Sequence, residues 1–349
     1  MVLLKDRLQN IDRQGYTDLS NLLVKTGNLH CTNVSDKVFA ILGIYYRVRN
    51  TRAATLLPQS LLEPDYSKSA ANVLRDATRF AIMESQRFFL LQYPPNRWAD
   101  IPSLPSWVPS WFGENAPGHE SNPLALEFDS GRGLPSLSSN AALISGRSGE
   151  LPLEGISVDA IEESTAVMTR EHLNHLHTLS ALLEQISTLV SKMESPLADP
   201  RGSSALGETL IAGEDLRYEP SSSEDVVRGW TAFSDYIMNQ RVYPPPWRAV
   251  READEHTRRA SDYHFQMYNA CRDRQFFSTQ NGYIGLGPSD LQQGDLVTVL
   301  QGGRWPFILR PEGEWYTMLG AAYVRPIMYG EAVAEAAKVG QPVVTFNIR

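Results

Sequence analysis

The chain has 349 residues, 42% of them hydrophobic and 21% charged, which is the composition of a globular protein with one large or two ordinary domains. Its formal net charge of -8 and its lack of Lys- or Arg-rich runs argue against binding to nucleic acids or anionic membranes. Cys31 and Cys271 are too few for a disulfide scaffold. Charged residues at positions 5–7 leave no signal-peptide core, and no stretch reaches the ~20 apolar residues of a membrane span. We expect a cytoplasmic protein.

The first third of the chain is predicted to be helical. The apolar run 36–46 (DKVFAILGIYY) predicts a short helix that ends near Gly43. A second helix, of about five turns, is predicted to start after an N-cap at Ser67 or Ser69. Its apolar residues share one side, and we expect its charged residues to lie on the other: Arg75, Asp76 and Arg79.

A segment rich in proline and tryptophan follows. Seven prolines within 93–124 exclude a long helix there. The tryptophans among them indicate an ordered loop, since disordered segments are poor in aromatic residues. Trp107 and Trp111 are candidate substrate-binding residues that could wall a site for an aromatic small molecule. Packing in the core is the favoured use of both.

The middle of the chain alternates between strand and helix patterns. Short strands are predicted at 141–144 and 151–158. Helical periodicity then dominates three stretches, at 171–193, 226–239 and 248–272.

The last quarter, from about Gln275 to Arg349, reads as short strands separated by tight turns. The turn signals are Asn281-Gly282, Gly302-Gly303 and Glu312-Gly313. Strands this short are typical of a small barrel or rolled sheet.

The predicted fold class is therefore α+β, with a helical N-terminal segment, an inserted helical segment and a small C-terminal β-barrel-like sheet. We expect a mostly helical domain over residues 1–125. A β-barrel-like domain over 126–349 would combine strands from about 141–158 and 275–349, with the helices of 171–272 inserted between them.

Five blocks of sequence together resemble one family. They are CTNVSDKVFAILGI at 31–44, PDYSKSAANVLRDAT at 64–78, LPSWVPSW at 104–111, the strand-rich stretch 276–311, and YVRPIMYGEAV at 323–333. This combination resembles the region downstream of the effector domain in fungal heterokaryon-incompatibility (HET) proteins. The resemblance implies a recognition or regulatory module in which these loops contact a partner protein.

Two departures from the family pattern limit what the resemblance implies. Asn33-Val34-Ser35 stands where the family has Asp-Pro-Arg, so the turn before Asp36 differs. The family's N-terminal effector motifs are missing from the 30 residues that precede Cys31. The resemblance therefore does not imply effector activity for this chain.

No metal or cofactor motif is present. His172, His175 and His177 lie on one predicted helix, but HExxH is absent and only the first two share a face, so an exposed polar face is favoured over a metal site. Neither a Walker A loop nor a complete dinucleotide fingerprint occurs. We expect a protein that works without a cofactor.

The candidate catalytic residues are Asp65, His256 and His264. The two histidines are eight residues apart on one predicted helix, a spacing that allows a general acid/base pair, although an exposed polar stripe would look the same. Asp65 either lines a pocket or caps the helix that follows it. The remaining candidates for substrate binding are Tyr66, Arg304 and Arg310, the arginines as ligands for a carboxylate or as plain surface residues.

Two functional hypotheses follow. The first is a cofactor-independent cyclase, isomerase or dehydratase of fungal secondary metabolism, built on a HET-derived scaffold and acting on an apolar or aromatic small molecule. The second is a HET-type recognition or regulatory module in the fungal self/non-self response, with a protein partner. The sequence favours the enzyme narrowly, because a recognition module without an effector domain has no attached activity to turn on or off.

Overall fold

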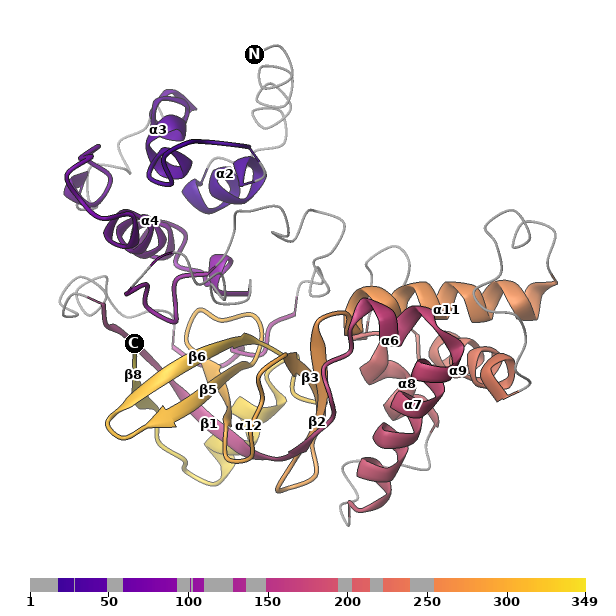
Figure 1. The fold of residues 1–349 in the computed structure, drawn as a ribbon. Coiled ribbons are helices and arrows are strands. Elements are labelled where there is room, and N and C mark those ends of the chain that lie inside the picture. Colours follow the sequence, from indigo (N-terminus) through magenta and orange to yellow (C-terminus); the bar gives the residue numbers. More distant parts are fainter. Residues whose placement is uncertain are drawn as a thin grey trace.

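A computed structural model describes most of the chain, and Figure 1 shows how its parts are arranged. The α+β class predicted from the sequence is confirmed, because helices and one mixed sheet make up the fold. Trp111 and the strand predicted at 141–144 lie outside the described residues, and the predicted domain boundaries stay a prediction. The described residues are 18–27, 29–48, 59–92, 101, 103–109, 128–135, 149–193, 203–213, 222–238 and 254–349.

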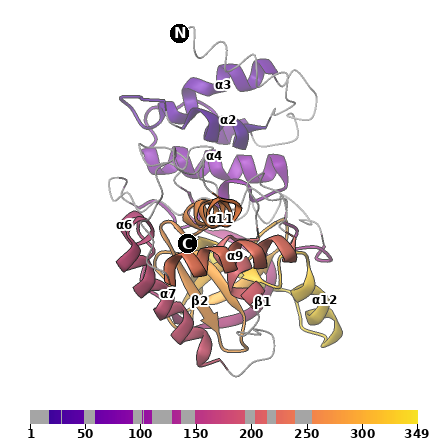
Figure 2. The ribbon, with the colours of Figure 1, turned by 90° about the vertical axis from the view of Figure 1, so that its right-hand side faces the viewer.

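The N-terminal helices are α2 (Leu19–Thr26), α3 (Asp36–Val48) and α4 (Ala70–Ser85), with short 3-10 turns at Gln59–Leu61 and Leu90–Gln92. They stack above the sheet in Figure 2. The Asp18 side chain caps α2, and the Ser69 side chain caps α4. The helix end predicted near Gly43 is wrong, because α3 continues to Val48 with its glycine on an exposed face.

Helix α4 is buried on both sides, which corrects the polar face predicted for it. Its carboxylate Glu84 accepts hydrogen bonds from the Leu19 backbone N–H at 2.7 Å and from the Tyr45 hydroxyl at 2.6 Å, and so ties α2 and α3 to α4. On the expected solvent side, Asp76 is only 5% exposed and Arg79 only 6%. The helix therefore lies between α2 and α3 above and the strands below.

The strands carry the turns that the glycines predict. Gly282, Gly302 and Gly313 all adopt positive φ, at 90°, 78° and 68°, a region that glycine enters without steric cost. Each lies between antiparallel neighbours, which confirms the three turn predictions. The strands are β1 (Leu151–Ser164), β2 (Arg274–Thr279), β3 (Ile284–Pro288), β4 (Leu296–Leu300), β5 (Phe307–Glu312), β6 (Trp315–Ala321), β7 (Tyr323–Arg325) and β8 (Val344–Ile348).

Strand β1 closes the sheet into a ring. The strand order is β4-β5-β6-β8-β1-β2-β3-β7, and a further pairing joins β1 to β4. The first part of β1 pairs with β8, its middle with β4 and its end with β2. Closure depends on Gly155, because a Cβ at this position would lie 2.3 Å from the carbonyl oxygen of Val299.

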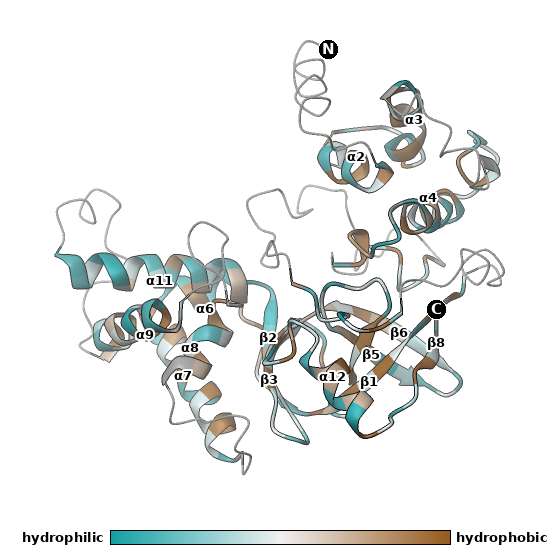
Figure 3. Cartoon of the chain, turned by 180° about the vertical axis from the view of Figure 1, so that it is seen from behind, coloured by the Kyte–Doolittle hydropathy of each residue, from teal (hydrophilic) through white to brown (hydrophobic). Residues whose placement is uncertain are grey.

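Helices fill the sequence between β1 and β2 and lie beside the ring in Figure 1. The helix predicted at 171–193 is broken at His175, whose backbone is extended, and α8 and α12 were not predicted. Figure 3 shows α11 as largely hydrophilic, as expected for a helix with one long exposed face. The bounds are α6 (Arg170–Asn174), α7 (Leu176–Ser191), α8 (Ser203–Leu210), α9 (Ser223–Met238), α11 (Glu255–Cys271) and α12 (Glu331–Lys338).

Helix α12 covers a second, smaller core on the ring, formed with Val297, Val299 and Ile308. The larger core joins the helices to the strands. Within the described part of the chain, every helix is too short or too polar to cross a bilayer.

Candidate functional site

The first two sequence blocks meet at the surface of the N-terminal helices. The Tyr66 hydroxyl donates a 2.7 Å hydrogen bond to Oδ1 of Asp36, and its ring packs edge-on against Phe39 with the centroids 5.1 Å apart. Tyr66 remains 63% exposed. The predicted substrate-binding tyrosine therefore joins two loops and still presents one face to solvent.

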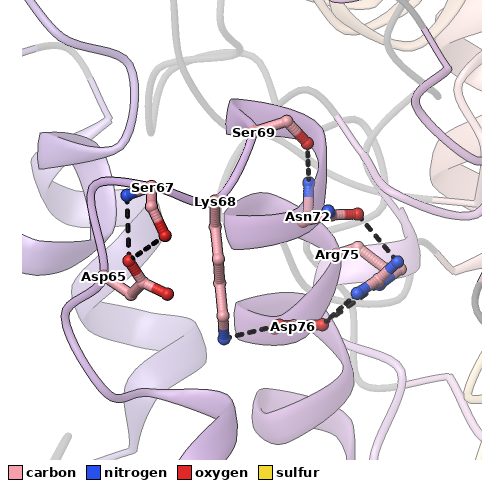
Figure 4. Close-up of polar contacts among 7 residues, drawn as sticks. All are labelled: Asp65, Ser67, Lys68, Ser69, Asn72, Arg75 and Asp76. Carbon is pink, nitrogen blue, oxygen red and sulfur yellow. Dashed lines mark hydrogen bonds and ion pairs between the residues drawn. The ribbon is translucent and has the colours of Figure 1, made fainter.

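Asp65 shapes the loop that leads into α4. Its Oδ1 accepts hydrogen bonds from the Ser67 hydroxyl at 2.6 Å and from the Ser67 backbone N–H at 2.9 Å, as Figure 4 shows. These bonds lower the pKa of Asp65 below its ordinary value, so the carboxylate is ionised at neutral pH. This geometry suits a turn-stabilising carboxylate, and as an acid/base group Asp65 would have to act as a weak base.

A charged cluster follows at the start of α4. Lys68 Nζ lies 3.3 Å from Oδ2 of the buried Asp76, and Arg75 Nη2 lies 2.8 Å from its Oδ1. Figure 4 shows both cations converging on this one carboxylate. Three of the charged residues in the block at 64–78 thus bind one another.

Trp107 connects α4 to the ring. It is 1% exposed, and its indole Nε1 donates a 2.9 Å hydrogen bond to the carbonyl oxygen of Gly149. The Arg79 guanidinium lies 5.5 Å from the centre of the indole ring and donates a 2.5 Å hydrogen bond to the carbonyl oxygen of Glu150. Trp107 is therefore a core residue at the junction, which is the packing alternative weighed for it above.

The preceding residue, Ser106, bridges two strands of the ring. Strands β6 and β8 pair only at Tyr316 and Ile348. Beyond that pair, Ser106 donates from its backbone N–H and its hydroxyl to the carbonyl oxygen of Arg349, and its Oγ accepts from the Met318 N–H at 3.0 Å. The LPSWVP block therefore completes the ring where its strands diverge.

The three predicted catalytic residues do not come together. Asp65 lies beside α4, on the opposite side of the molecule from α11, which carries both histidines (Figures 1 and 4). His264 is 8% exposed, stacks on Phe233 and bonds through Nε2 to the carbonyl oxygen of Leu173 at 2.9 Å. His256 is half exposed and lies 3.8 Å from a carboxylate oxygen of Asp235.

Burial lowers the pKa of His264 to about 4, although its hydrogen bond to the Leu173 carbonyl opposes the shift. The imidazole is therefore neutral at pH 7, with its proton on Nε2, where it can donate to that carbonyl. A histidine in this state anchors α11 to the end of α6.

We predict that acid weakens the fold through His264. In the unfolded chain the histidine is protonated below about pH 6.5, whereas in the native protein it stays neutral down to about pH 4. The contribution of the neutral, buried His264 to the free energy of unfolding is therefore fully present above about pH 6.5 and is lost as the pH falls toward 4. The loss should reach about 3 kcal/mol. Urea denaturation from pH 7.5 to 4.5 measures it. His264→Phe should flatten the profile, whereas His256→Phe should leave it unchanged; equal profiles for all three proteins would contradict the prediction.

The predicted arginine ligands lie on the ring. Arg310 binds both oxygens of Asp295, with Nε at 2.8 Å and Nη2 at 3.0 Å, and also contacts the carbonyl oxygen of Asp290. The carboxylate predicted for Arg310 is thus one from its own chain. Arg304 is half-buried in the loop between β4 and β5, where its carbonyl oxygen accepts from the Ser130 N–H.

Replacing Arg310 by methionine should destabilise the fold by about 2 kcal/mol, because the Asp295 carboxylate, 2% exposed, loses its charged partner. Arg132→Met is the matched control, since Arg132 forms an exposed ion pair with Asp129 that should contribute under about 1 kcal/mol. Thermal unfolding of the wild type and of both variants measures the two losses of stability. Equal losses in both variants would refute the ranking.

Arg79 and Ser106 were missed as contact residues. Arg79 sits directly before the apolar run Phe80–Met83, which could have indicated burial on that side of the helix. Ser106 gave no signal of its own, since its contacts come from strands far along the chain. Among the described residues, no group of three or more His, Cys, Asp or Glu side chains is placed to hold a metal ion.

Comparison with known proteins agrees with the sequence blocks. A family model described as the Het-6 beta-barrel domain matches residues 234–340, which include β2 to β7 and α12. Heterokaryon incompatibility protein 6, OR allele, of Neurospora crassa is 24% identical over 353 aligned positions, which cover 88% of this chain and 50% of that protein. The chain spans about half the length of this curated relative.

No solved structure matches the chain. The family model covers the last two of the blocks quoted above, and both matches confirm the resemblance that those blocks carry. The chain is accordingly similar to fungal heterokaryon-incompatibility (HET) proteins.

Proposed function

We propose that this chain is a recognition or regulatory module of the heterokaryon-incompatibility type, which works in the cytoplasm by binding a protein partner. The observation that carries the proposal is the similarity to heterokaryon incompatibility protein 6, since it extends over 88% of this chain. The alignment is long enough to include both the helices and the ring.

The contacts of the sequence blocks support this proposal. The polar groups of Trp107 and Ser106 form hydrogen bonds with the backbones of Gly149, Met318 and Arg349. The motifs thus hold helices and ring in one arrangement, which is what a module that presents a fixed surface to a partner needs.

The competing proposal is the cofactor-free cyclase, isomerase or dehydratase. It needs acid/base groups within reach of one substrate. Asp65 and the α11 histidines lie on opposite sides of the molecule, so an active site would have to use only one of these two regions (Figure 1).

Gene deletion in the encoding fungus separates the two proposals. We expect altered compatibility in hyphal fusion tests between strains, with an unchanged metabolite profile. Complementation with the Asp65→Ala, His256→Ala double variant should restore the wild-type phenotype, because Asp65 bonds within its own loop and His256 is half exposed, so the double variant should still fold. Altered metabolites with unchanged compatibility, and no rescue of those metabolites by the double variant, would replace recognition by catalysis.

A further inference from the structure

Strand β8 has one edge that is open over part of its length. Its other edge pairs with β1 from Val344 to Ile348. Toward β6, which runs parallel to it, β8 pairs only at Ile348, opposite Tyr316. In that register, residues 344–346 would need partners at 312–314, where β5 ends and the chain turns into β6. Within the described ranges, this edge of β8 is therefore left without a neighbouring strand, beside the β5–β6 hairpin (Figure 1).

The main-chain groups of Thr345 point to this open edge. Thr345 lies opposite Glu154 of β1, but the Glu154 carbonyl oxygen accepts a 2.8 Å hydrogen bond from the N–H of Gln301, which follows β4. Two residues that face each other across an antiparallel pair point their main-chain groups either toward each other or both away. The N–H and C=O of Thr345 therefore point away from β1. In a pairing that extends β8 by one residue, Val343 supplies a second pair of outward groups.

The open edge is apolar and carries no charge. Val343 is 41% exposed and Val344 43%. Residues 339–348 contain no charged side chain. Free strand edges usually carry charged residues that prevent pairing with another chain. An exposed, uncharged edge with β-branched side chains can instead accept a further strand.

We propose that two copies of this chain dimerise through their β8 strands, which pair antiparallel along these open edges about a two-fold axis at Val344. Thr345 of each copy then lies opposite Val343 of the other, and the two residues exchange main-chain hydrogen bonds. The two Val344 side chains are neighbours across the axis. The occupant is a second copy because the edge is complementary to itself: its outward-pointing residues fall opposite each other, and no charge repels an identical strand. This inference does not depend on the proposed function.

Sedimentation equilibrium of the purified chain tests the dimer. Two short strand segments bury little surface, so we expect a monomer–dimer equilibrium with a dissociation constant on the order of 10 μM. A monomer at every concentration from about 1 to 300 μM would overturn the proposal.

Variants locate the contact. Val344→Lys brings two like charges together at the axis and should raise the dissociation constant at least tenfold. Thr345→Pro removes only an N–H that points away from β1, so it should weaken the dimer as strongly and leave the fold intact. Met238→Lys, at a position on α9 that is 81% exposed, is the matched control and should leave the constant unchanged. A wild-type constant in whichever β8 variant folds would refute the site.

A disulfide tests the register. Cys31→Ser first removes the exposed native thiol. In this background, Val344→Cys should link two copies on mild oxidation, because facing residues at a non-hydrogen-bonded position have Cα atoms about 4.5 Å apart, within reach of a disulfide. Met238→Cys in the same background should remain monomeric on a non-reducing gel. A Val344→Cys protein that also stays monomeric would overturn the pairing about Val344.

Discussion

Replacing Trp107 by alanine should destabilise the protein by about 4 kcal/mol, the cost of deleting a large buried aromatic side chain. The indole is 1% exposed, lies against the Arg79 guanidinium and donates to the carbonyl oxygen of Gly149. Its loss would leave a cavity, an unpaired carbonyl and a less shielded cation at one place. Urea denaturation followed by circular dichroism measures the change in the free energy of unfolding.

Trp107→Phe separates packing from hydrogen bonding. Phenylalanine keeps most of the apolar contact but cannot donate to Gly149, so this variant should lose about 1–2 kcal/mol. Because Trp107 joins the helices to the ring, the alanine variant should also unfold less cooperatively, with the helical signal lost before the strand signal. A Trp107→Ala protein with wild-type stability would mean that the junction is held elsewhere.

Adding a single methyl group at Gly155 should destabilise the fold by about 3 kcal/mol, the upper end of the usual cost of overpacking. The new Cβ would lie 2.3 Å from the Val299 carbonyl oxygen and 2.9 Å from the Leu300 Cα, both backbone atoms that cannot swing away. The Gly155→Ala variant should therefore force β1 and β4 apart where they close the ring. Thermal denaturation gives the change in stability.

Gly43→Ala is the matched control with the opposite sign. Gly43 lies on the exposed side of α3, and a Cβ there would meet no atom within 4 Å. Alanine should stabilise the helix by about 1 kcal/mol, because it has the higher helix propensity. If both alanine variants shifted stability in the same direction, the steric explanation of Gly155 would fail.

Local chemistry made the strand-rich end predictable. Gly282, Gly302 and Gly313 each impose a tight turn through their own backbone conformation, so the sequence around each is sufficient to place it. The α+β class follows from the same local patterns. Helix α12 was not predicted, because it is a short Ala- and Glu-rich segment that lies within a strand-rich stretch.

The solvent-exposed polar face predicted for α4 was wrong because the helix is buried on two faces. A helix with charged residues along one side usually turns that side to solvent, but here Arg79 faces the ring and Asp76 is enclosed by cations. For the candidate site, the sequence offered Trp107 as a substrate-binding residue or as a core residue, and its burial is that of a core residue. Its contacts could not be inferred, since Gly149 and Arg79 become its neighbours only in the folded chain.

The pairing of β1 with β2 has a consequence for synthesis of the protein on the ribosome. Thr165, just after β1, bonds to Phe276 of β2, 111 residues later. At typical translation rates, β2 is synthesised roughly 5–20 s after β1, and β4 and β8 follow later still. During that time the apolar side chains of Leu153 and Ile161, which are buried in the folded protein, lack the strands that cover them. The intervening helices can already form from local contacts. Nascent chains stalled before β2 should therefore be the species that chaperones bind and that aggregates during overexpression.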